Sequence, residues 1–149
     1  MSKQIKALRS HCPINFALEM FGDKWSLLIL RDIIFRGKKS FGEFLRSEEG
    51  FATNILSVRL QHLLEIDILT KDKDEVDARK DVYRLSEKGL DLVPMLMEMI
   101  LWSAKYDPDS EAQRIKPLLS EIRADNRTLS THLAEKVRRG EGIVKDYLG

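Results

Sequence analysis

The run from Phe51 to Leu64, FATNILSVRLQHLL, constrains the fold most, because it predicts a helix with two different faces. At about 100° per residue, one side carries only leucines and is typical of a stripe that faces a core. These leucines are Leu56, Leu60, Leu63 and Leu64. The opposite side mixes amide and imidazole side chains with branched apolar ones. It holds Asn54, Ile55, Val58, Gln61 and His62.

This second face has two interpretations. It could be an ordinary solvated helix face, although Ile55 and Val58 are poor residues for plain exposure to water. Alternatively, Asn, Gln and His side chains can hydrogen-bond to base edges, and branched apolar side chains can contact a thymine methyl group. We favour the second interpretation and expect the five residues to read bases in double-stranded DNA. Arg59, which lies between the two faces, is expected to have a structural role rather than to contact phosphate.

Three predicted helices precede this run. Pro13 favours a helix start, because a proline at the first helical position loses no hydrogen bond, and Gly22 ends that helix. Its expected buried stripe is Phe16, Ala17, Met20 and Phe21. Residues 24–36 are apolar on most sides, which predicts a helix at the centre of the domain. A capping box, SFGE at 40–43, begins a short third helix, and residues 47–50 form a turn.

The segment after the run predicts a hairpin and then a long helix. Strands are expected at 68–71 and 82–85, joined by the charged loop 72–79. Ser86 is placed to cap the following helix, and Pro94 must kink or loosen that helix. This order of elements predicts a mainly α fold with a small β-hairpin wing, that is, a winged helix-turn-helix.

Composition fits this fold but does not suggest DNA. The chain has 149 residues, 43% of them hydrophobic and 33% charged, and 25 Lys and Arg residues are opposed by 24 Asp and Glu residues. A net charge of +1 is low for a DNA-binding protein, so the argument depends on where the charges lie. No apolar run is long enough to span a membrane, and the N-terminus does not resemble a signal peptide. The single cysteine favours the cytoplasm.

Two parts are predicted along the chain, a winged helix-turn-helix and dimerisation domain at 1–106 and a helical extension at 107–149. The extension shows the spacing of two amphipathic helices and has 8 basic and 8 acidic residues. Its apolar stripes are too narrow for helices that stand alone, so they must pack on something. The candidates are the rest of the chain, a second subunit or an effector pocket. We favour dimer reinforcement over an effector lid.

Several short motifs occur in a consistent order between residues 12 and 105. They are Cys12-Pro13, GDKW at 22–25, LIL at 28–30, FGEFL at 41–45, Leu56-Ser57, Arg59-Leu60, Leu63 and YRLSEKG at 83–89. Together they resemble the HxlR-type family of bacterial winged helix-turn-helix transcriptional regulators. The resemblance implies a homodimer that binds a palindromic operator and regulates nearby genes. Some members of this family respond to reactive small molecules through thiols, so a small-molecule or oxidant effector is a further implied partner.

The chain departs from the family pattern at three points. Ala52 replaces a Ser or Thr that opens the reading helix, so Thr53 or nothing must cap it. Asp67 replaces a glycine that usually follows this helix. The wing loop 72–77 is acidic and would be repelled by phosphate. Contacts with the DNA backbone are therefore expected from residues around the reading helix and the wing base, namely Lys38, Lys39, Thr53, Lys71, Arg79 and Lys80.

The resemblance also implies that the first helix and the long helix after the wing are shared between subunits. The expected dimer surface is Leu90, Val93, Met97, Ile100 and Leu101. Cys12 has two interpretations. It can be a small apolar residue without a function, which we favour, or a redox sensor whose thiol is made more acidic by the helix N-terminus. With one cysteine per chain, a sensor would need a bond between subunits or a small-thiol adduct.

Catalysis has no support in the sequence. His11, His62 and His132 are scattered, and no group of residues has the spacing of metal ligands. A glycine-rich phosphate loop and a nucleophile elbow are both absent, so we expect neither enzymatic activity nor a cofactor or metal. One alternative to a DNA-binding regulator remains, a winged-helix module that binds protein through its apolar exposed residues and acidic wing.

Overall fold

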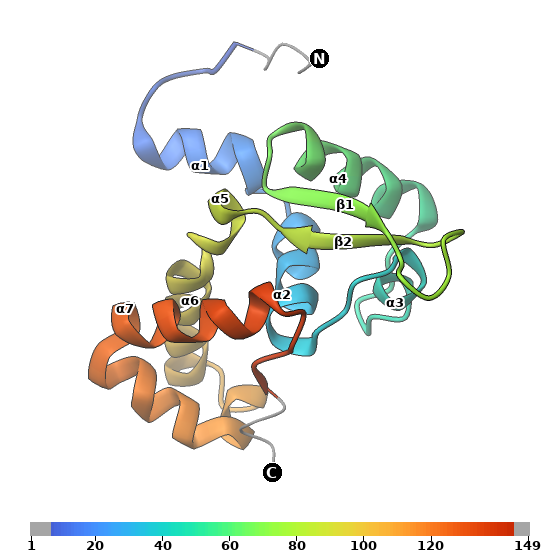
Figure 1. Ribbon diagram of the computed structural model, residues 1–149. Coiled ribbons are helices and arrows are strands. Elements are labelled where there is room, and N and C mark those ends of the chain that lie inside the picture. Colours follow the sequence, from blue (N-terminus) through green and yellow to red (C-terminus); the bar gives the residue numbers. More distant parts are fainter. Residues whose placement is uncertain (1–6, 145–149) are drawn as a thin grey trace.

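The computed structural model describes residues 7–144, in which a helix-turn-helix with a hairpin lies beside a second group of helices (Figure 1). The elements follow the predicted order. They are α1 (Pro13–Phe21), α2 (Ser26–Arg36), α3 (Phe41–Leu45), α4 (Thr53–Glu65), β1 (Leu69–Lys73), β2 (Asp81–Leu85), α5 (Glu87–Leu90), α6 (Val93–Tyr106), η1 (Glu111–Ile115) and α7 (Lys116–Arg138).

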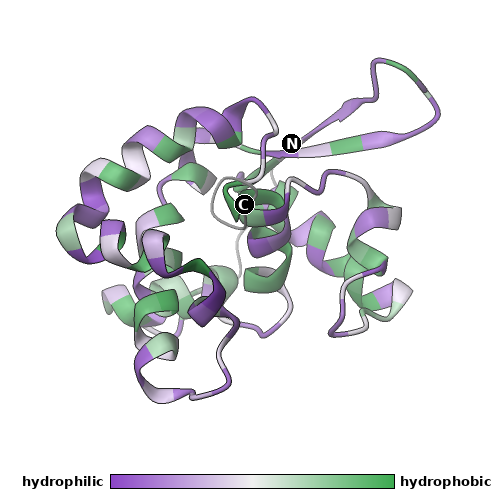
Figure 2. Ribbon diagram, turned by 90° about the horizontal axis from the view of Figure 1, so that it is seen from below, coloured by the Kyte–Doolittle hydropathy of each residue, from purple (hydrophilic) through white to green (hydrophobic). Residues whose placement is uncertain are grey.

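Helix α2 is central, as its apolar sequence predicts. Ile29, Leu30 and Ile34 have no exposed surface, and Figure 2 shows this hydrophobic helix enclosed by the other elements. The capping box is present at α3, where the Ser40 hydroxyl accepts a hydrogen bond from the Glu43 backbone N–H at 3.3 Å. These two helices fix the position of α4, which turns its leucine stripe inward.

The wing is a two-stranded antiparallel sheet in which Leu69 is opposite Leu85 and Lys73 is opposite Asp81. Before β1, Asp67 adopts a left-handed backbone conformation with φ of 64°. Glycine adopts this conformation without strain, and Asp is among the residues that tolerate it best. Asp67 therefore adopts the left-handed conformation that the glycine expected from the resemblance would adopt most readily.

The helix after the wing divides at its proline. Ser86 caps α5 by accepting a hydrogen bond from the Gly89 N–H at 3.1 Å, and α5 ends at Leu90. A new helix, α6, then starts with Pro94 in its first turn, where a proline is compatible with helix geometry. The predicted kink is therefore a complete break between two helices.

The extension packs on its own chain. Helix α7 crosses α6 (Figure 1), and its kink at Asp125 divides it into the two expected amphipathic segments. Leu118, Ile122 and Leu133 belong to the same buried cluster as Val93 and Met97. The extension therefore packs on the rest of the chain, which was the first of the three candidates. Residues before and after position 107 share one core.

The last described residues return to α2. The Ile143 N–H donates to the Ile34 carbonyl at 3.1 Å, and the Ile143 side chain is fully buried. Gly142 packs so closely on the end of α2 that a Cβ there would lie 2.7 Å from the Gly37 nitrogen and the Phe35 oxygen. The chain therefore closes on the turn that follows its central helix.

Helix α1, by contrast, is poorly covered. Among its apolar residues only Met20 is buried, while Ile14 is 70% exposed, Phe16 44% and Leu18 53%. The prediction that Phe16 belongs to a buried stripe is wrong for the single chain, because no element within residues 7–144 covers this part of α1. In the described residues no helix is both long and apolar enough to cross a membrane.

Candidate nucleic-acid interface

The outer face of α4 is exposed, polar and uncharged. Helical spacing brings five exposed residues onto it: Thr53, Asn54, Ser57, Val58 and Gln61. Val58 is 59% exposed, so its methyl groups are accessible to a molecule that docks on this face. Ser57 belongs to this face but was not predicted, because a small polar residue has no effect on a hydrophobic pattern.

Two of the predicted base-reading residues lie at the edge of this face instead. Ile55 is half-buried. His62 is also half-buried, and its Nε2 lies 2.7 Å from the carbonyl oxygen of Met20. A carbonyl only accepts, so this nitrogen must carry the proton and donate to α1. His62 therefore links α4 to α1 by a hydrogen bond. Its predicted role in reading bases is corrected to this structural contact.

The amino end of α4 has no side-chain cap. Ala52 is the N-cap residue, and Thr53 lies inside the first turn rather than capping it. The first backbone N–H groups of the helix thus stay free to bind an anion. Arg59 pairs with Asp23, their closest atoms 3.6 Å apart. Asp23 in turn accepts hydrogen bonds from the N–H groups of Trp25 and Ser26 at the start of α2, so Arg59 has the expected structural contact.

Buried charge holds the turn between α3 and α4. Asp32 of α2 is fully buried, and its carboxylate contacts Arg31, Lys38 and the Ser47 hydroxyl. Lys38 Nζ also donates to Ser47 at 2.8 Å, and the lysine side chain is only 18% exposed. Lys38 is therefore not a surface cation, and its expected phosphate contact is corrected. It neutralises Asp32 and fixes the turn.

A second contact reaches the same turn. Arg31 binds Glu49 through both Nη atoms, with one Nη2–Oε1 distance of 2.9 Å. This hydrogen bonding lowers the pKa of Glu49 from its usual 4.5 to about 2, so the carboxylate stays charged well below pH 4.5. Sequence reasoning missed this pair, because nothing in the local pattern joins two residues that are 18 positions apart.

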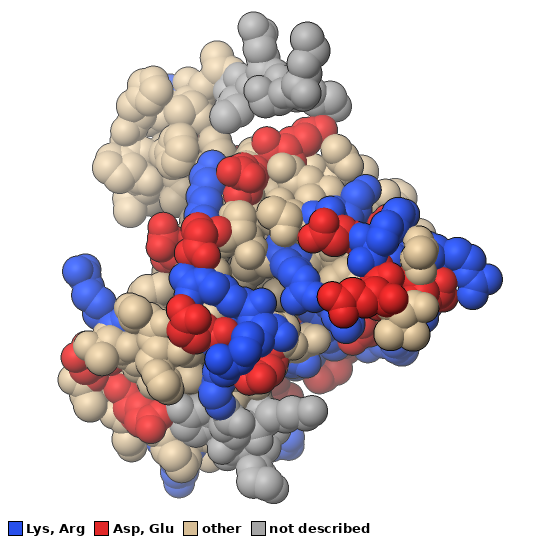
Figure 3. Space-filling view, viewed as in Figure 1, with Lys and Arg blue, Asp and Glu red and all other residues tan. Residues whose placement is uncertain are grey.

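The wing carries both signs of charge, as Figure 3 shows at the right of the molecule. Arg79 pairs with Asp77 at 3.0 Å, which lowers the pKa of Asp77, and Lys73 pairs with Asp81 at 2.8 Å. Asp74 accepts hydrogen bonds from the N–H groups of Val76 and Asp77, which order the loop. Asp74, Asp77 and Asp81 of the wing thus have structural partners.

The remaining predicted phosphate contacts differ in their surroundings. Lys39, Lys71 and Lys80 are exposed on or beside the wing. The Lys39 carbonyl accepts the Tyr83 N–H at 2.8 Å, so the backbone before α3 is fixed against β2. Arg79 is 92% exposed, but its guanidinium is partly neutralised by Asp77. Lys39, Lys71 and Lys80 are exposed and form no ion pair within the described residues, so they are the cations of this region most available to a DNA backbone.

Cys12 is exposed at the start of α1. The backbone N–H groups of Asn15 and Ile14 lower the pKa of its thiol, in the sense expected at a helix N-terminus. Both interpretations of this residue are compatible with its position.

The expected dimer surface changes with the position of α7. Leu90, Val93 and Met97 are 5%, 0% and 0% exposed in the single chain, so they have no surface to offer to a second copy. Ile100 and Leu101 are half-buried. The exposed apolar residues of α6 are instead Met99, Trp102 and Tyr106, while those of α1 are Ile14, Phe16 and Leu18. Figure 3 shows that few charged side chains lie over α1.

The helix pair α3–α4 followed by the hairpin β1–β2 defines a winged helix-turn-helix DNA-binding protein. Residues 20–111 match the model of the HxlR-like helix-turn-helix family, and the chain belongs to this family. It is a DNA-binding transcriptional regulator and not an enzyme.

Known relatives agree with this assignment. The chain is 34% identical to the uncharacterized HTH-type transcriptional regulator Rv3095 of Mycobacterium tuberculosis, over 83% of this chain and 78% of the relative. It is 33% identical to the HTH-type regulator sll1512 of Synechocystis over 59% and 64% of the two chains.

Solved structures show the same fold. A crystal structure of PA1607, a candidate transcription factor, superposes with a TM-score of 0.62 at 37% identity and covers 69% of this chain and 72% of that one. The reduced form of the regulator YodB from B. subtilis covers 68% of this chain and 99% of its own, with a TM-score of 0.54 at 21% identity.

Proposed function

We propose that the protein binds DNA in a sequence-specific manner through the exposed face of α4, with Asn54, Val58 and Gln61 contacting bases. The observation that carries this proposal is the composition of the face, because exposed amides beside an exposed valine suit base edges and thymine methyl groups. Asn and Gln bind adenine through two hydrogen bonds. Ser57 lies between them and adds a hydroxyl group.

Phosphate contacts in this proposal come from Thr53 and the free N–H groups at the start of α4, and from Lys39, Lys71 and Lys80. Arg79 would contribute only if phosphate displaced Asp77. Few free cations face the DNA, which agrees with the net charge of +1. Base contacts and dimerisation would therefore supply a large share of the affinity.

We propose further that two copies pair through α1 and the exposed apolar side of α6, and that the dimer binds a palindromic operator. On α1 alone, three large apolar side chains are uncovered in the single chain. A two-fold axis at this surface would present two α4 helices to half-sites about 34 Å apart, one turn of duplex. Such a regulator acts where DNA lies, which in bacteria is the cytoplasm.

A salt titration tests the proposal. Affinity for random duplex should fall steeply with salt, since each neutralised phosphate releases counterions. Gln61→Ala should weaken binding to a selected operator by about 1–3 kcal/mol without changing the salt slope. Gln113→Ala, which alters a glutamine of η1, is the matched control. Salt-independent binding, or equal loss with both variants, would contradict base reading by α4.

A further inference from the structure

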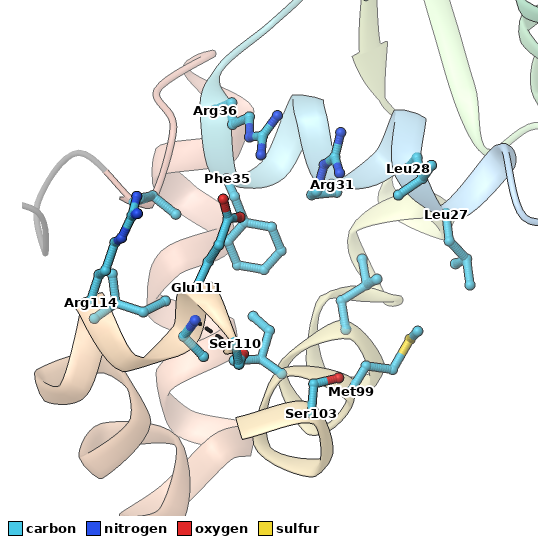
Figure 4. Close-up of a pocket in the computed structure, with 15 residues that line it drawn as sticks. Leu27, Leu28, Arg31, Phe35, Arg36, Met99, Ser103, Ser110, Glu111 and Arg114 are labelled. Carbon is cyan, nitrogen blue, oxygen red and sulfur yellow. Dashed lines mark hydrogen bonds between the residues drawn. The ribbon is translucent and has the colours of Figure 1, made fainter. Parts of the chain in front are cut away.

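An apolar cavity of about 440 Å³ lies between α2, α6 and η1 (Figure 4). Its walls are mainly Leu27, Leu28, Phe35, Leu96, Ile100 and Ile115. Both the size and the apolar lining are typical of sites for small molecules. Residue Ile115 comes from η1, outside the 20–111 region that matches the family, so the extension completes this cavity.

The charged groups of the cavity are mostly cations. Arg31 and Arg36 come from α2, and Arg114 comes from η1, against the single carboxylate of Glu111 (Figure 4). Arg31 and Arg36 both contact the buried Asp32. Arg114, by contrast, has no ion pair within the described residues and is exposed to solvent. An apolar space with an unpaired guanidinium at its rim fits a ligand with an apolar body and one negative charge.

The cavity is connected to the DNA-reading part of the chain through Arg31. Arg31 is one of the residues that line the cavity, and its guanidinium binds Glu49 in the α3–α4 turn through two hydrogen bonds. A carboxylate held at the rim by Arg114 would add a negative charge to the cavity that Arg31 also lines, and this charge would weaken the Arg31–Glu49 ion pair. The turn that positions α4 would then lose one of its contacts with α2, while the Ser47–Asp32 and Arg36–Glu48 contacts remained.

We propose that this cavity binds a small amphipathic monoanion, such as a fatty or aryl carboxylate, and that occupancy lowers the affinity of α4 for DNA. The binding part of this proposal stands on the cavity alone. Its effect on DNA rests on the proposed function, so the two parts are measured separately.

Binding is tested without DNA, by calorimetry of the full chain with octanoate, octan-1-ol and octylammonium. Octanoate should bind about three- to fivefold more tightly than octan-1-ol, the range of an exposed ion pair, and octylammonium should bind most weakly. Arg114→Gln should remove the preference for octanoate, while Arg127→Gln, which alters an exposed arginine of α7, should keep it. Equal affinity for the three probes would overturn the proposed ligand class.

A blocking variant tests the location. Ser103 lines the cavity from α6, so Ser103→Phe should fill the space and abolish octanoate binding. If this variant does not fold, Ser103→Leu is a smaller intrusion that should weaken binding by about fivefold. Unchanged binding by a folded Ser103 variant would place the ligand elsewhere and overturn the proposal.

The effect on DNA is measured with a selected operator fragment at saturating octanoate. Its affinity should fall at least about threefold for the unaltered chain, less than the loss of a full base contact. The folded Ser103 variant should bind DNA normally and show no response. Octanoate binding without a change in DNA affinity would overturn the coupling through Arg31. Failure of the chain to bind any DNA would overturn the proposed function and leave the calorimetric result standing.

Discussion

Helices α1 and α7 are both amphipathic and both flank the winged core, but only α7 has its apolar side covered. Leu118, Ile122 and Leu133 of α7 are buried against α6, whereas Ile14, Phe16 and Leu18 of α1 are exposed. The difference lies in the partner and not in the sequence pattern. The C-terminal extension completes the core of its own chain, which leaves α1 as a surface for a second one.

The largest effect is expected from deleting residues 109–149. Without α7, the apolar side chains of Leu90, Val93 and Met97 would face water, so the truncated chain should lose its cooperative thermal transition. Circular dichroism of the full and truncated chains measures this loss. A truncated chain that melts cooperatively near the temperature of the full chain would show that the core does not need α7.

A substitution that creates a cavity in the α7 packing should give the next largest effect. Ile122 is 2% exposed, so Ile122→Ala should lower the free energy of unfolding by about 2–5 kcal/mol. Urea titration at fixed protein concentration is the measurement. Thr131→Ala, at an exposed position of the same helix, should change it by about 0.5 kcal/mol or less. Similar losses for both variants would mean that α7 contributes helix propensity rather than packing.

Substitutions in α1 should have the opposite effect, because they should weaken self-association and not the fold of the single chain. Replacing Ile14 and Phe16 by serine should leave the fold of each chain intact but weaken self-association about tenfold or more, as expected when central apolar contacts of an interface are removed. Sedimentation over a range of concentrations measures this change. Val76→Ser removes a 97% exposed valine at the wing tip and is the control. If the control weakens association as strongly, the proposed surface is misplaced.

The smallest effect is expected from the Arg31–Glu49 ion pair. Its contribution to stability can be compared with that of the apolar packing of α7. The folded-state pKa of Glu49 is about 2, below its usual 4.5, so this pair stabilises the fold fully above pH 4.5 and loses that contribution as the pH falls towards 2. Because Glu49 is 35% exposed, the gain should be about 1 kcal/mol or less.

Glu49→Gln tests this assignment. The difference in unfolding free energy between the unaltered chain and the variant should be constant from pH 5 to 7, within about 0.3 kcal/mol, and should shrink between pH 4.5 and 2. A difference that grows as the pH falls would contradict the depressed pKa.

Local patterns were sufficient to predict the winged helix-turn-helix. The leucine stripe of α4, the Ser40 cap and the hairpin depend on neighbours within a few residues, and all of them are present. The outer face of α4 was mostly predicted for the same reason. Three residues differ from the prediction. Ser57 has no hydrophobic signal, Ile55 is half-buried at the edge of the face, and His62 makes a hydrogen bond across 42 positions.

Long-range partners could not be predicted from local patterns. The apolar side of α6 was predicted correctly, but periodicity does not say whether α7 or a second subunit covers it. In the sequence, Lys38 has the pattern of a surface lysine. In the fold, Asp32 and Ser47 contact its side chain. In each case the missing information is the identity of the partner, which the fold supplies.

The contact of Gly142 with the end of α2 has a consequence for synthesis of the chain. Residues up to Ile143 must leave the ribosome before the Ile143 N–H can donate to the Ile34 carbonyl and before Gly142 can pack against Gly37. The helix-turn-helix segment emerges first, and the apolar side of α6 stays uncovered until α7 has emerged. The core around α2 and α6 is therefore complete only after α7 and Ile143 have emerged, and chains that stop before α7 would expose apolar surface that quality-control proteases can recognise.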